Sequence, residues 1–187
     1  MSKKSFRVAA VAAALTVFGL AAPQTALAGT SNPAPKPASV SAGDIHFSAK
    51  ATAKTKSLVK ANLKAAAAGA NVCGAGYNVS VYAERMPNPN QRYATLYLWT
   101  NGQSTGPSYD DKPICAVLAN ETGAKQSMGI RLKSNYTDDA AREDFGTFGT
   151  YAGPVYQNRG YCGTVYSYMK MGGRVVIDAV RGVGSCN

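Results

Sequence analysis

The sequence predicts an all-β fold, a small antiparallel sandwich or barrel of about seven strands held together by disulfides. After residue 72 apolar and polar residues alternate with a period of two, as they do in half-buried strands. Residues 73–187 contain eleven tyrosines and nine valines but only four leucines, which favours strands over helices. All four cysteines lie there too, after a tail that is expected to be flexible or partly helical.

Residues 1–28 have the pattern of a secretory signal peptide. Three basic residues precede an apolar run of 15 residues, 8–22, which is shorter than the roughly 20 residues that a membrane-spanning helix needs. Ala26-Leu27-Ala28 then supplies a small-residue cleavage pattern. We therefore expect a secreted, extracellular protein with no membrane span in the mature chain.

Residues 29–70 are predicted to be a linker rich in proline, alanine and lysine. Its one helical candidate is 49–68, where Val59 and Leu63 recur at near-helical spacing and Gly69 is placed to cap the end. Because this apolar stripe is thin, a frayed helix or a disordered spacer is the first interpretation. A helix docked on the domain and a basic segment attracted to anionic polymer are the alternatives.

The β domain is predicted to span residues 71–187. Its strands are separated by clusters of Gly, Pro, Asn and Asp, which favour turns. The expected strands are 77–82, 93–100, 114–119, 127–133, 145–151, 163–171 and 174–181.

The best-defined hairpin is expected at Gly172-Gly173, because two glycines tolerate the positive φ angles of a type I′ turn. Counting outward from this turn places Tyr168 opposite Ile177. The same register brings Cys162 close to the segment that holds Cys186.

Four cysteines allow three disulfide connectivities, and the sequence alone does not choose among them. The hairpin register favours Cys162 with Cys186, which leaves Cys73 with Cys115. A zinc site is disfavoured because no C-x-x-C pair and no neighbouring histidine accompany the cysteines.

Charge and composition argue against several functions. Residues 29–72 carry six lysines and one acid, whereas residues 73–187 carry eleven basic and nine acidic side chains, so the domain has no basic footprint for nucleic acid. His46 is the only histidine and lies in the tail, so no histidine-based catalytic arrangement is expected in the domain. We expect no enzyme activity and no cofactor.

Three acidic pairs are the remaining candidates for catalysis or calcium binding. They are Asp110-Asp111, Asp138-Asp139 and Glu143-Asp144. Paired carboxylates can act as glycosidase acid and base or as calcium ligands. Because each pair lies in a polar, turn-like stretch, solvated surface charge is the first interpretation.

The strand 93–100 carries a candidate glycan-binding surface. Tyr93, Tyr97 and Trp99 are separated by four and two positions and so lie on one side of the strand, where their rings could stack on sugars. Ordinary core packing is the stronger alternative, because either this side or the leucine side of the strand could face the core.

The residues around the cysteines resemble a known family. Cys73-Gly-Ala-Gly-Tyr77, Cys115-Ala-Val117 and Tyr151-Ala-Gly-Pro-Val155 followed by Cys162 are similar to the spore-associated protein A family of exported actinobacterial proteins. The resemblance covers about residues 71–175; the continuation to Cys186 and the long tail depart from it. It implies an exported β domain on spore or aerial surfaces, with no catalytic residues to carry over.

We therefore expect an exported, non-enzymatic surface or spore-associated protein, whose partner would be cell-wall or spore-surface polymer. A carbohydrate-binding module for cell-wall or extracellular glycan is the alternative. A secreted hydrolase or protease inhibitor is the second alternative.

Overall fold

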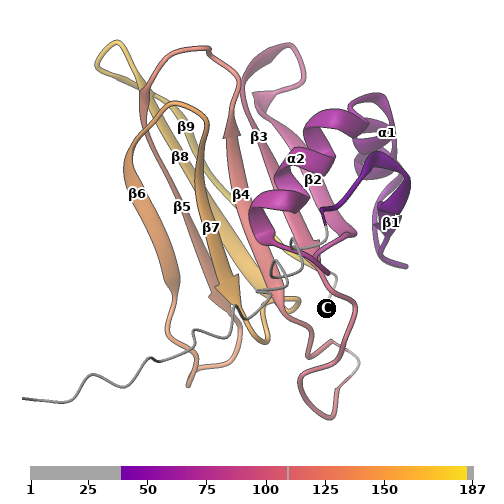
Figure 1. Cartoon of the computed structure of the whole chain (residues 1–187). Helices are drawn as coiled ribbons and strands as arrows, with labels where there is room; N and C mark the ends of the chain where they lie inside the picture. The colour runs from indigo at the N-terminus through magenta and orange to yellow at the C-terminus, as the bar shows by residue number, and fades with distance from the viewer. Residues whose placement is uncertain (1–38, 109, 185–187) are drawn as a thin grey trace, which may run out of the picture. The chain divides into compact units, whose positions relative to one another are not determined.

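Two β-sheets face each other in a sandwich (Figure 1). The structure is a computed structural model that describes residues 39–108 and 110–184, so the predicted signal peptide lies outside the described residues. The five-stranded sheet has the order β1 (His46–Phe47), β2 (Val79–Asn88), β3 (Gln91–Thr100), β4 (Ile114–Asn120) and β7 (Tyr151–Gln157). The four-stranded sheet has the order β6 (Arg142–Phe148), β5 (Gln126–Ser134), β8 (Gly163–Met171) and β9 (Arg174–Gly182). The all-β prediction is confirmed, and of its two alternatives the fold is a sandwich.

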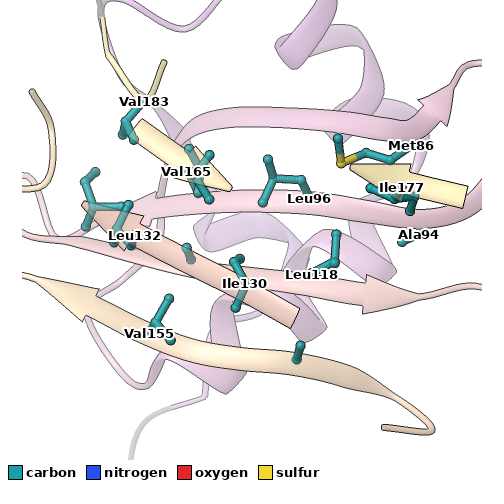
Figure 2. Packing of buried hydrophobic residues seen from close by; sticks show 14 of the residues in the cluster. Met86, Ala94, Leu96, Leu118, Ile130, Leu132, Val155, Val165, Ile177 and Val183 are labelled. Carbon is teal, nitrogen blue, oxygen red and sulfur yellow. The ribbon is translucent and has the colours of Figure 1, made fainter. Parts of the chain in front are cut away.

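One hydrophobic core fills the space between the sheets. Alternate residues of the central strands point into it, among them Leu96 and Leu98 of β3 and Ile130 and Leu132 of β5, and all four are fully buried. Figure 2 shows Leu96, Ile130 and Leu132 with their side chains in this layer. The other side of each strand therefore faces outward from the sandwich.

The predicted strand 145–151 is wrong, because two strands meet there. β6 ends at Phe148, a turn follows, and β7 begins at Tyr151 in the opposite sheet. Gly149 lies in this turn, and it marks the break that the apolar residues on either side concealed. The short strand β1 was not predicted, and it pairs in parallel with β2.

The predicted hairpin at Gly172-Gly173 is present, with positive φ angles of 53° and 83° at the two glycines. The register beyond the turn is shifted by one residue, because an irregularity between Met169 and Lys170 leaves an extra residue on β9. Tyr168 therefore lies opposite Asp178, where Ile177 was expected. Ile177 instead points into the core and is fully buried.

Two helices pack on the outer side of the five-stranded sheet, so the predicted flexible spacer is wrong for this segment (Figure 1). A 3-10 turn, η1 (Ala42–Asp44), precedes α1 (Ala53–Ala61) and α2 (Leu63–Cys73). Asn62, with φ −138° and ψ 44°, separates α1 from α2. The expected boundary at residue 71 and the expected helix end at 68 both fall inside α2.

The helices dock through small side chains. Val59 of α1 and Ala66 and Ala70 of α2 are fully buried against the sheet, whereas Leu63 is 38% exposed because the break at Asn62 rotates it away from Val59. Gly69 is not the C-terminal cap that the sequence suggested.

Gly74 takes the capping position instead, with φ 90°. Gly69 lies within α2, where a Cβ atom would come within 3.3 Å of Tyr97 Cδ2 and 3.5 Å of Trp99 Nε1. The helix can approach these two rings closely because it presents no side chain at this position.

A disulfide joins the end of α2 to the sheet. Cys73 is bonded to Cys115 of β4, with 5.9 Å between the Cα atoms, as predicted. The second predicted bridge involves Cys186, which lies outside the described residues, so the Cys162–Cys186 pairing stays a prediction. No cysteine of the described ranges is free.

Candidate functional site

The aromatic side of β3 is not an exposed surface. Tyr97 and Trp99 are 2% and 0% exposed beneath α2, and their rings stack on each other with 6.2 Å between centroids. Burial raises the pKa of Tyr97 to about 12. Tyr93 is partly buried and packs against the other core, between the sheets. The three predicted glycan-stacking residues therefore do not form a shared sugar-binding shelf.

The four-stranded sheet presents a second outer face, which we call the exposed sheet face. Both helices lie on the side of the five-stranded sheet, away from this face (Figure 1). The cross-strand register arranges its side chains in rows that run β6, β5, β8, β9. The rows are Glu143, Arg131, Tyr166, Val180; then Phe145, Gly129, Tyr168, Asp178; then Thr147, Ser127, Lys170, Val175; and, from β5 to β9, Lys133, Thr164, Gly182.

Phe145 is the most exposed aromatic ring of this face, at 43%. It lies against Gly129, where a Cβ atom would overlap the ring. Its centroid is 6.2 Å from that of Tyr166, with a stacked geometry, and 6.4 Å from that of Tyr168. The three rings form a continuous aromatic platform across β6, β5 and β8.

The Arg131 side chain contacts both the aromatic platform and the carboxylate of Glu143. Its guanidinium carbon lies 5.5 Å from the ring centroid of Phe145 and 5.9 Å from that of Tyr166, so both rings make cation–π contacts with it. The Arg131 Nε donates to the carboxylate of Glu143, in an ion pair whose side chains are about half exposed. These contacts hold the guanidinium beside both rings.

A pocket of about 250 Å³ opens beside the platform. Its lining combines two cations, one hydroxyl, one aromatic ring and one aliphatic group, from Arg131, Lys133, Thr164, Tyr166 and Val180. Lys133 makes no ion pair within residues 39–108 and 110–184. Burial and the negative charge of nearby Asp178 raise the pKa of the Tyr166 hydroxyl.

Of the predicted acidic pairs, Glu143 lies on the exposed sheet face, where it pairs with Arg131, and other members hold loops and strands together. Asp111 is 3% exposed and accepts a hydrogen bond from the Tyr136 hydroxyl at 2.5 Å, which lowers the pKa of the carboxyl group. Asp144 accepts from the backbone N–H of Gly153 at 2.8 Å and so ties β6 to β7. These contacts indicate structural roles.

Asp138 and Asp139 share one partner. The guanidinium of Arg159 contacts Asp139 at 2.6 Å and Asp138 at 2.9 Å, and it lies 4.0 Å from the ring centroid of Tyr136. Hydrogen bonds from Arg159 lower the pKa of Asp139. Within the described ranges, no group of three or more His, Cys, Asp or Glu side chains is arranged to hold a metal ion.

Sequence reasoning missed the exposed sheet face, although its signal is present in Met128-Gly-Ile-Arg-Leu-Lys133. The apolar residues of this run alternate with Gly129, Arg131 and Lys133, and a glycine inside a strand often marks a close approach of another group. Of the helices in the described part of the chain, none is long and apolar enough to cross a membrane. Comparison with family models, curated proteins and solved structures finds no match to this chain.

Proposed function

We propose that this chain is an exported, non-enzymatic surface protein whose folded domain binds cell-wall or extracellular glycan through the exposed sheet face. The observation that carries the proposal is the platform of Phe145, Tyr166 and Tyr168 on the sheet face that neither described helix covers. Aromatic rings offer flat apolar surface to the C–H faces of sugars, and flanking polar groups bind the hydroxyls.

The apolar content of this face supports binding. Phe145, Val175 and Val180 are 43%, 52% and 59% exposed, and they lie on the same side of one sheet as the two tyrosines. Exposed apolar side chains gathered on one face among charged ones are typical of an interaction site. A rigid sheet holds the rings in place before a ligand arrives, which lowers the entropic cost of binding.

Export is supported by the predicted signal peptide and by the disulfide between Cys73 and Cys115, because disulfides persist in oxidising compartments. Attachment to a spore or cell surface follows from the resemblance to the spore-associated protein A family. The non-enzymatic part of the proposal is supported by the acidic pairs, since Asp111, Asp139 and Asp144 are engaged in contacts that hold loops and strands together.

Binding of the purified secreted chain to a glycan array, followed by titration of the best ligand, tests this proposal. We expect the Phe145→Ala variant to bind that ligand about tenfold more weakly than the unchanged protein. Leu63→Ala is the matched control, because Leu63 is similarly exposed but lies on α2, and it should bind as the unchanged protein does.

Two results would overturn the proposal. If Phe145→Ala kept full affinity for the glycan, the exposed sheet face would not be the binding site. Release of sugar or peptide fragments from a wall polymer, abolished by Asp144→Asn, would show an enzyme. Sedimentation of both proteins provides a further control, because a dimer that dissociates on Phe145→Ala would make this face a contact between copies of the chain.

A further inference from the structure

The pocket beside the aromatic platform is positively charged. Arg131 and Lys133 line it, and none of its lining residues is acidic. The Arg131 Nε donates a hydrogen bond to Glu143. Within the described ranges the other two guanidinium nitrogens have no hydrogen-bond partner. The Lys133 ammonium group has no partner within those ranges either, so the pocket presents unused donors on two cations.

The remaining acid of the face lies outside the pocket. Asp178 is on β9, one row away, opposite Tyr168, and its negative charge acts on the Tyr166 hydroxyl. The two acids of this face therefore interact with Arg131 Nε and with Tyr166. Neither carboxylate pairs with Lys133, whose positive charge is left without a counter-charge in the described part of the chain. An anionic group on a ligand complements this arrangement.

We infer that the preferred ligand is an acidic polysaccharide, whose uronate carboxylate binds Arg131 and Lys133 while its sugar ring stacks on the aromatic platform. This inference rests on the proposed function and names the ligand class for the same site. The Arg131 guanidinium carbon lies 5.9 Å from the Tyr166 ring centroid. A pyranose ring over Tyr166 thus places a carboxylate on its own C5 carbon within reach of Arg131.

The pocket favours a uronate over a polymer of phosphodiesters for a geometric reason. Its aromatic ring and its cations lie within one row of each other, which suits a ligand whose charge is attached directly to a sugar ring. A glycerol phosphate polymer carries charge but no ring for Phe145 or Tyr166. The Thr164 hydroxyl, opposite Lys133, supplies a donor or acceptor for a sugar hydroxyl.

The test compares binding of the full secreted chain to polygalacturonate and to its fully methyl-esterified form, which is neutral. We expect at least tenfold tighter binding to the acid. Lys133→Gln should reduce that preference about fivefold. Lys170→Gln is the matched control, since Lys170 is an exposed lysine of the same face outside the pocket, and it should change the preference less than twofold.

The outcomes separate the inference from the proposed function. Equal binding to the acid and its ester, lost on Phe145→Ala, would overturn the inference and leave the proposed function standing. Equal effects of Lys133→Gln and Lys170→Gln, or equal binding to poly(glycerol phosphate), would show attraction by charge alone and would also overturn it. No binding to either polygalacturonate form, together with an empty glycan array, would overturn both.

Discussion

The ring of Phe145 on β6 lies against the backbone of Gly129 on β5, and no side chain separates the two strands at this point. The glycine thereby sets the height of the ring above the sheet. With any larger residue at 129, the Phe145 ring would have to move and would lose its stacked contact with Tyr166. The aromatic platform therefore depends on a glycine, which has no side chain to contact a ligand.

Gly129→Ala should weaken glycan binding about as much as Phe145→Ala does, roughly tenfold, because the added methyl group displaces the ring. Affinity for the array-selected glycan measures the effect. Ser127→Ala, two residues away on the same side of β5, is the control and should leave the affinity unchanged. If Gly129→Ala bound normally, the position of the Phe145 ring would not matter for function.

Gly69→Leu should destabilise the protein by about 1 to 3 kcal/mol, because the new side chain would overlap Tyr97 and Trp99 and push α2 off the sheet. Trp99 is the only tryptophan, so its fluorescence should shift to the red as it becomes exposed. In a free helix the same change would be stabilising, since leucine is the better helix former.

Ala68→Leu is the control for this effect. Ala68 is the exposed neighbour of Gly69 in α2, so the substitution should change neither the stability nor the Trp99 emission by much. Equal behaviour of the two variants would mean that the helices do not dock in solution, and it would restore the interpretation of this segment as a spacer.

Peptide mapping without reduction should find the Cys73–Cys115 bridge of the structure together with the predicted Cys162–Cys186 bridge. Replacing both Cys73 and Cys115 by alanine should lower the free energy of unfolding by about 4 kcal/mol, because the bridge spans 42 positions of the chain. Chemical denaturation measures that loss. A peptide linking Cys73 to Cys186 would contradict the pairing.

Glu84 makes stability depend on pH at the junction of α1, β2 and β9. Burial alone would raise the pKa of Glu84, but hydrogen bonds from Tyr82, Arg181 and Lys54 outweigh it and lower the pKa. A carboxyl group whose pKa is lowered on folding stabilises the protein above its unfolded pKa, and this contribution disappears as the pH falls through the folded pKa.

Glu84→Gln should therefore cost about 1 to 2 kcal/mol of unfolding free energy at pH 7 and progressively less as the pH falls from 5 to 3. Thermal unfolding across this range checks the prediction. Glu143→Gln is the control, because its ion pair with Arg131 is about half exposed and should contribute little at any pH. A Glu84→Gln deficit that stayed constant down to pH 3 would rule out titration of this group.

The sequence was sufficient to predict the strands whose apolar residues alternate, such as β5 and β8, and the turn at Gly172-Gly173. It was not sufficient for the register of β9. An extra residue within the uniformly β-branched run Val175-Val176-Ile177 leaves no sign in the alternation. Register beyond a bulge is fixed by which residue reaches the core, here Ile177, and that choice depends on the opposite sheet.

The docked helix was only an alternative to a flexible spacer, and the exposed sheet face escaped prediction, for related reasons. Both sides of β3 are apolar, which is typical of a strand that is covered on both faces. The segment that covers it is rich in alanine, so its apolar stripe was too narrow to predict that the helix docks on the sheet. Small residues were what the close approach to Trp99 required. The platform needs Phe145 and Gly129 to be paired across strands, and that pairing follows only from the register.

Mapping the glycan contact by amide chemical shifts tests the central claim most directly. On addition of the array-selected glycan, the largest changes in amide chemical shift should occur on β5, β6 and β8, around Gly129, Phe145 and Tyr166. The amide chemical shifts of α1 and α2 should not change. The largest shifts on the helices or on the loops around Asp111 and Asp139, with the exposed sheet face unaffected, would contradict it.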